Sequence, residues 1–177
     1  AMHEAHPDKQ GNAIDLGGRT ADEWCDTLRR CLALVGEFLP TLRARLAAKS
    51  PRAMAEACHA ASMCGSAVAE LAPTLIERCT TDPDVGVRVM AVAAIRTVAP
   101  NAPATYQAMT SALADPSHVV RILAVGHLQD ASTIDAATVQ SMLGLLEADP
   151  DPDVRDRAAD TLAAHTIGAE FASRALT

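Results

Sequence analysis

Aromatic side chains are nearly absent from this sequence. Its 177 residues include one Trp, one Tyr and two Phe, so a folded core must be built almost entirely from aliphatic side chains. Ala occurs 37 times, and hydrophobic residues make up 49 % of the chain. Because Ala is the best helix former and a poor strand former, the composition predicts an all-α fold and argues against a β-sandwich or barrel.

Positive charge is also scarce. The chain has 15 Lys and Arg against 22 Asp and Glu, which gives a net charge of −7. Phosphate binding needs a basic surface, and single-strand binding usually adds aromatic stacking platforms, so we expect no nucleic-acid partner. The acidic excess is concentrated in residues 81–177, with 6 basic and 12 acidic side chains. That half would suit a protein partner with a basic surface.

Cysteine is present but does not form the even set of a disulfide framework. The five Cys stand at irregular spacing, at positions 25, 31, 58, 64 and 79, and we expect them to be small buried residues in a reducing compartment. No basic segment leads into a hydrophobic run at the N-terminus, so neither a signal peptide nor a membrane partner is predicted. These features together predict a cytoplasmic protein.

Recognisable catalytic motifs are missing too. There is no G-x-S-x-G, P-loop, G-x-G-x-x-G or H-E-x-x-H. His59 lies near Cys58 and Cys64, but it lacks the i, i+3 or i, i+4 spacing by which two helix residues share a metal, and we expect it in the packed core. The sequence therefore predicts no catalytic residue, no cofactor and no metal site, and favours a protein that is not an enzyme.

Three segments in the second half of the chain align with one another. Each contains Asp-Pro, then Val-Arg, then Ala three residues after the Arg and Ile or Leu seven residues after it. The arginines, Arg88, Arg121 and Arg155, recur at an almost constant interval. Because the Val, Ala and Ile or Leu positions fall on one face of a helix, each segment predicts a helix with the same buried stripe.

The Asp-Pro pairs predict where these helices begin. Asp is a favoured N-cap and Pro suits the first helical turn, so we expect starts near Asp82, Asp115 and Asp149. In the third segment, Asp151 and Pro152 are an alternative start. Another apolar-periodic segment precedes each helix, over residues 68–79, 104–113 and 136–146, so the repeating unit is a pair of helices.

The length of this unit is itself informative, since a two-helix period of roughly 33 residues is typical of an α-solenoid. The motif D-P-x-x-x-V-R-x-x-A-x-x-x-[IL], over about residues 66–166, resembles the HEAT-like repeats, including the variety found in phycobilisome lyases. The resemblance implies a right-handed solenoid of about three helix pairs over residues 66–177. Before it we expect a tail or extended arm over residues 1–19 and a divergent helical cap over residues 20–65. Within the cap, Ser50-Pro51-Arg52 could open a degenerate repeat, with His59 in place of Ile or Leu.

The repeated Asp and Arg residues have two possible roles. They could form a binding row for a charged ligand. The resemblance to HEAT-like stacks instead favours a structural ladder, in which Asp caps a helix and Arg ties it to the adjacent loop. The ladder residues are Asp82, Arg88, Asp115, Arg121, Asp149 and Arg155.

The opposite face of each second helix is the predicted partner-binding surface. In HEAT-like folds this helix usually lines the concave face, and here its residues run from apolar to acidic. The candidate binding residues are Val89, Ala93, Arg96, Ile122, Gly126, Gln129, Asp156 and Asp160. An acidic rim is expected from Asp149, Asp151, Asp153, Asp156 and Asp160. Exposed apolar residues in a row predict a protein contact, unless the arm or tighter packing covers Val89 and Ile122.

The sequence thus favours a non-catalytic protein-binding module that acts as an adaptor, inhibitor or scaffold. The alternative is a small-ligand-binding or lyase-like HEAT-repeat enzyme or chaperone. A deep pocket with convergent His or Cys side chains would favour that alternative.

Overall fold

The computed structural model describes residues 6–7, 13–14, 34 and 36–175, with side chains described to residue 166. The chain divides into two compact units, residues 1–41 and 42–177. In the first unit, β1 (His6–Pro7) and β2 (Ala13–Ile14) pair in antiparallel fashion. Most of the predicted tail, and the cap up to residue 33, lie outside the described residues.

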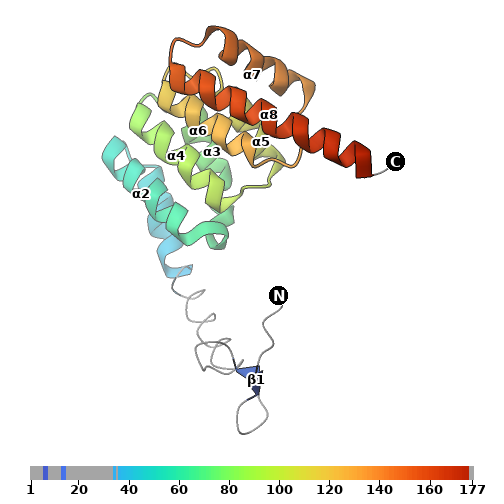
Figure 1. Cartoon of the computed structure of the whole chain (residues 1–177). Coiled ribbons are helices and arrows are strands. Elements are labelled where there is room, and N and C mark those ends of the chain that lie inside the picture. Colours follow the sequence, from blue (N-terminus) through green and yellow to red (C-terminus); the bar gives the residue numbers. More distant parts are fainter. Residues whose placement is uncertain (1–5, 8–12, 15–33, 35, 176–177) are drawn as a thin grey trace. The chain divides into compact units, whose positions relative to one another are not determined.

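The second unit is a stack of helices. A helix over residues 36–46 leads into it, and Figure 1 shows α2, α4, α6 and α8 following one another through the stack. The elements are α2 (Pro51–Cys64), the 3-10 helix η1 (Gly65–Leu71), α3 (Ala72–Thr81), α4 (Val85–Val98), α5 (Pro103–Ala112), α6 (His118–Gln129), α7 (Ala136–Ala148) and α8 (Pro152–Ala175).

These helices form pairs that pack on their neighbours. Within pairs, α3 contacts α4, α5 contacts α6 and α7 contacts α8, while the second helices contact one another in the order α2, α4, α6, α8. The predicted α-solenoid is therefore confirmed. Its core contains the predicted Val and Ala stripe, which is fully buried in all three copies: Val87, Ala91, Val120, Ala124, Val154 and Ala158.

The helix α2 occupies the position of a second helix, one repeat before α4. Its N-cap, Ser50, stands one repeat length before Asp84, the N-cap of α4. Counting from these caps places Met54 at the arginine position and Ala57 at the repeated Ala position, and both are buried. The sequence alignment on Arg52 was displaced by two positions, because no arginine marks the motif here. His59, expected in the core, is exposed.

Two of the cysteines behave as core residues. Cys58 and Cys79 are buried, and Cys64 is half-buried. Burial raises the pKa of the Cys58 thiol to about 11 and that of the Cys79 thiol to about 12. Both thiols therefore stay protonated near neutral pH and act as small apolar groups.

The second helices begin about three residues after the aspartates of the Asp-Pro pairs. Asp84 and Ser117 are the N-caps of α4 and α6, so the predicted N-cap role of Asp82 and Asp115 is wrong. In the third copy the alternative start holds, since Asp151 Oδ1 accepts from the backbone N–H groups of the first turn of α8.

The reason is that the aspartates of the Asp-Pro pairs stabilise the loop before the helix. Asp82 Oδ1 accepts from the N–H of Asp84 at 3.0 Å, and Asp115 Oδ1 accepts from the N–H of Ser117 at 2.8 Å. Asp149 Oδ1 likewise accepts from the N–H of Asp151, at 2.9 Å. Each aspartate closes an Asx turn, and the N-cap falls two positions later.

The other contacts of these aspartates are made by arginine. Arg121 donates from Nε and Nη2 to the two carboxylate oxygens of Asp149, both at 2.7 Å. Its Nη1 donates to the carbonyl oxygens of Asp115 at 2.9 Å and Pro116 at 3.2 Å. One guanidinium thus joins the loop of its own repeat to the loop of the next. Hydrogen bonds from Arg121 are the main cause that lowers the pKa of Asp149.

The preceding junction repeats this geometry. Arg88 donates from Nε and Nη2 to Asp115 at 2.8 and 3.0 Å, and from Nη1 to the carbonyls of Asp82 and Pro83. The hydrogen bond to Asp115 raises the pKa of Arg88. We call these two-sided contacts the Arg–Asp ladder. A bidentate pair of this kind is stronger and more directional than a single neutral hydrogen bond.

The ladder predicts a difference between two arginines. Arg121→Ala leaves the buried Asp149 carboxylate without its partner, so we expect a loss of about 3 to 5 kcal/mol in unfolding free energy. Arg155 contacts only carbonyls of its own loop among the described residues, so Arg155→Ala should cost about 1 kcal/mol. Urea unfolding followed by circular dichroism measures both, and equal losses would contradict the ladder.

Candidate protein-binding face

The exposed sides of α2, α4, α6 and α8 form one surface, which we call the second-helix face. The predicted binding residues are distributed on it in two classes. Arg96, Asp156 and Asp160 are exposed, whereas the other five are half-buried: Val89, Ala93, Ile122, Gly126 and Gln129. Val89 and Ile122 were expected to face solvent fully. They do not, because α4 and α6 pack side by side.

Two exposed apolar residues on this face lie in the first turns of α4 and α6. Val85 is 47 % exposed and Val119 is 39 % exposed. They stand three and two positions before the arginines, and the sequence interpretation did not include them because it considered only positions after each arginine. Met63, near the end of α2, is 77 % exposed and was missed because its repeat had not been aligned.

Gly126 marks an open position in the middle of the face. A Cβ atom placed on it would meet nothing within 4 Å. The same holds for Gly144, which lies in the first helix α7 of its pair. Neither glycine is required by its backbone conformation, so a side chain at either position is compatible with the fold.

The acidic rim is smaller than predicted. Asp149 does not belong to it, because its side chain is only 3 % exposed and is bound to Arg121. Asp151 accepts from the first turn of α8, and one of its carboxylate oxygens lies 3.9 Å from His118 Nε2. Asp153, Asp156 and Asp160 are exposed on α8 and make up the rim.

A pocket of about 340 Å³ with a mixed polar and apolar lining lies between the loop after α4 and the loop after α6. Arg96 Nη2 donates to Asp130 Oδ2 at 3.0 Å at its edge. Tyr106 donates its hydroxyl hydrogen to Thr138 Oγ1 at 2.9 Å and accepts from the N–H of Asp135 at 3.0 Å. The polar side chains of Arg96, Asp130 and Tyr106 in the pocket lining are therefore already hydrogen-bonded to each other or to neighbouring residues.

His127 is the one buried titratable group in the pocket lining. It is 7 % exposed, and desolvation, followed by the nearby charge of Arg96, lowers its pKa. The imidazole is therefore neutral at pH 7. The sequence offered one signal: His127 stands six residues after Arg121, where the other two copies hold the small residues Ala94 and Thr161.

The lowered pKa of His127 has a consequence for stability. The unfolded chain takes up this proton near pH 6.5 and the folded chain only at lower pH, so the unfolding free energy falls as pH drops below about 6.5. Each unit of lowering corresponds to about 1.4 kcal/mol of this loss. In His127→Asn the loss is absent, so the stability difference between the wild-type protein and the variant should shrink from pH 7 to pH 5. Parallel curves in urea unfolding at both pH values would refute this account.

Other kinds of site find no support in the described part of the chain. There, no three His, Cys, Asp or Glu side chains are grouped so that they could hold a metal ion. No helix among the described residues has both the length and the apolar character needed to cross a membrane.

Comparison with known proteins identifies the repeats. A family model described as HEAT repeats matches residues 72–163. This match is to HEAT repeats in general and does not single out the phycobilisome-lyase variety. No match to a curated protein or to a solved structure accompanies it.

Proposed function

The chain belongs to the family of HEAT-repeat proteins, and we propose that it is a non-catalytic protein-binding module that acts as an adaptor, inhibitor or scaffold. Helical solenoids commonly use their extended surfaces for binding. The buried thiols of Cys58 and Cys79 suit a reducing compartment such as the cytoplasm.

The observation that carries the proposal is the set of apolar residues on the second-helix face. Val85 and Val119 expose apolar side chains to solvent, and the half-buried Val89 and Ile122 lie about one helical turn further along α4 and α6. Gly126 leaves open space on the same face. Covering exposed valines contributes about 25 cal/mol per Å² of apolar surface buried, and a side chain of the partner fits where Cβ atoms are missing.

The acidic rim supports a partner with a basic surface. Asp153, Asp156 and Asp160 follow one another along α8 and are exposed, so their negative potential reaches into solvent. Such rim charges speed encounter and select against acidic partners more than they add to affinity.

The alternative function, binding of a small ligand, would use the pocket beside His127. Its size is adequate for a small molecule. However, the Arg96–Asp130 pair and the hydrogen bonds of Tyr106 already satisfy the groups that would fix a ligand. A single buried His without a second catalytic group favours packing over chemistry, so protein binding is the stronger candidate.

Gly126 offers a sharp test of the second-helix face. Gly126→Met should leave the melting temperature unchanged or slightly higher, because a helix-interior glycine costs about 1 kcal/mol relative to good helix formers. It should weaken partner binding about tenfold or more by filling the open space. Gly144→Met is the matched control, since it adds the same side chain at an equally open position on α7.

Affinity capture with quantitative mass spectrometry measures this difference. Proteins retained by the wild-type chain and by Gly144→Met but lost with Gly126→Met are partners of the face, and their dissociation constants can then be determined with purified proteins. Identical protein sets for all three chains would show that the partner uses another surface.

The acidic rim has its own signature in association kinetics. With a partner identified by this capture, Asp160→Lys should slow association about tenfold at low salt and reduce the salt dependence of the rate. Glu77→Lys makes the same charge change at an exposed position on α3 and should have a smaller effect. Stopped-flow measurements at several ionic strengths distinguish the two, and equal effects would mean that only net charge matters.

A further inference from the structure

The Arg–Asp ladder ends in an arginine that keeps only half of its contacts. Arg155 Nη1 donates to the carbonyls of Asp149 at 2.7 Å and Pro150 at 3.3 Å, as Arg88 and Arg121 do in their own loops. In those two arginines, Nε and Nη2 bind the aspartate of the next repeat. Within the part of the chain that the structure describes, Nε and Nη2 of Arg155 have no such acceptor.

The helix face around Arg155 is open in the same way. The positions four and seven residues after the arginine are buried at 0 % exposure in the interior repeats, where they hold Val92, Ile95, Val125 and Leu128. In α8 the same positions hold Ala159 and Leu162, and both are half-buried. They remain apolar although no following repeat among the described residues covers them.

The first helix of this pair shows a matching pattern. Leu146 and Val139 on α7 are half-buried, whereas the residues at the same positions of α3 and α5 are buried: Cys79, Ala72, Ala112 and Thr105. Arg155 and these apolar surroundings form what we call the end face. The exposed acidic rim lies on a different side of α8, since Asp156 and Asp160 are one and five positions beyond Arg155.

We propose that the end face is a second protein-docking site. It binds a HEAT-like helix pair whose loop aspartate, between the two helices, is held by Arg155. The ligand group is a carboxylate held in an Asx turn, in the geometry that Asp115 and Asp149 adopt inside this chain. This inference concerns a surface other than the second-helix face and does not depend on the function proposed for it.

Two features fix the chemistry of the occupant. The inner hydrogen bonds of Arg155 hold its guanidinium in place before anything binds, so little side-chain entropy is lost when a carboxylate arrives. The two vacant donors lie side by side on a planar fork that matches the two oxygens of one carboxylate. Apolar residues around the fork require that the carboxylate come with an apolar helix surface.

A second copy of this chain does not supply that carboxylate. Its own loop aspartates, Asp82, Asp115 and Asp149, are engaged inside the stack, and their side chains are 1 %, 9 % and 3 % exposed. The occupant is therefore a helix pair of another protein.

The test supplies such a helix pair on the full chain. The chain is lengthened after Thr177 by a Gly-Ser linker of about 20 residues, with a mean span of about 25 Å, and then by a copy of residues 99–134. This copy carries α5, α6 and the loop with Asp115. A matched version carries Asp115→Asn in the appended copy alone, which keeps the shape of the side chain and removes its charge.

Docking at Arg155 should raise the melting temperature of the Asp version above that of the Asn version by roughly 3 to 10 °C. Arg155→Gln in the lengthened chain should abolish this difference. Equal melting temperatures of the Asp and Asn versions, or a difference that persists in Arg155→Gln, would overturn the proposal.

Sedimentation of the chain without the extension provides the remaining check. A monomer that does not change with concentration agrees with an occupant of another kind. A dimer that Arg155→Gln dissociates would show that a second copy covers the end face, and would overturn the proposal in that respect. Neither measurement changes Gly126 or the acidic rim, so failure here and failure of the proposed function are distinguishable.

Discussion

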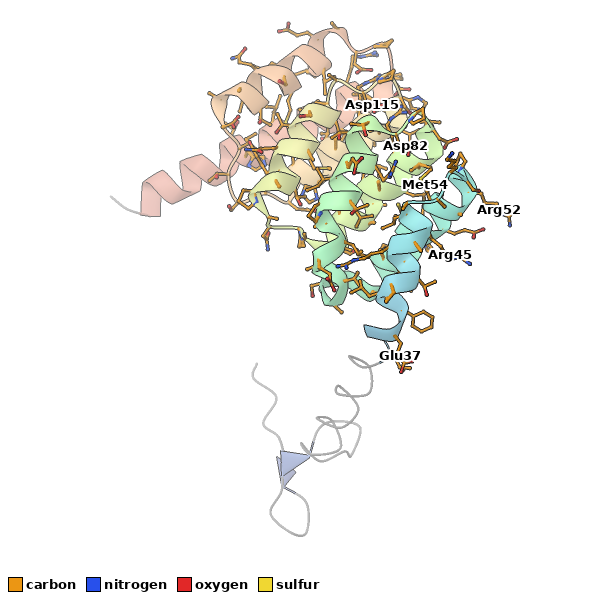
Figure 2. The ribbon with its side chains drawn as sticks, turned by 180° about the vertical axis from the view of Figure 1, so that it is seen from behind. Glu37, Arg45, Arg52, Met54, Asp82 and Asp115 are labelled. Atoms are coloured by element: carbon orange, nitrogen blue, oxygen red, sulfur yellow. The ribbon has the colours of Figure 1, made fainter. Side chains whose placement is uncertain are left out.

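The stack depends on one arrangement, an arginine that holds its own loop with one nitrogen and the next repeat with the other two. The carbonyl contacts orient the guanidinium, and the carboxylate contacts fix the distance between successive repeats. Because both partners are nearly buried, removing either leaves an uncompensated charge, although the intact pair adds much less to stability than that loss suggests. The ladder therefore mainly determines how one repeat is placed on the next, while the Val and Ala stripe provides most of the burial. Figure 2 shows Asp115, Asp82 and Met54 one below another along the stack.

The sequence predicted the helix pairs because their buried stripe recurs at a fixed distance from a repeated arginine. The sequence interpretation misplaced the N-caps, because an aspartate before a helix can either cap that helix or close the loop that precedes it. The amino-acid sequence does not distinguish these two roles. The structure shows that Asp115 has a second partner, because it brings Arg88 into contact with it across 27 residues of sequence. The helix α2 escaped the alignment for a related reason, since Met54 replaces the arginine and only the small residues of the stripe remain.

The binding face was predictable in outline but not in its exposures. A helical wheel describes one helix alone, and it placed Val89 and Ile122 opposite the buried stripe. Their half-buried state comes from the neighbouring second helix, whose distance is set by side chains elsewhere in the core. The pocket beside His127 was still further from reach, because two loops from successive repeats form it together. Charge was a partial guide, since Asp153, Asp156 and Asp160 are exposed as predicted, whereas Asp149 is buried against Arg121.

The two ends of the ladder differ in a way that bears on what each end does. At the first end, no arginine of the preceding pair binds Asp82 among the described residues, and Arg78 of α3 takes that place with Nη1 at 3.4 Å from Oδ2. Met54 fills the position of the missing arginine with an apolar side chain, which suits a junction that α2 already covers. At the other end, Arg155 keeps the residue type, the inner hydrogen bonds and the apolar neighbours of an interior junction. A repeat that met only water on this side would need neither of the last two, because a polar outer face is what protects the end of a solenoid. Among the described residues, the junction between α2 and α4 thus lacks the ladder, whereas α8 keeps the arginine and the apolar positions that form it.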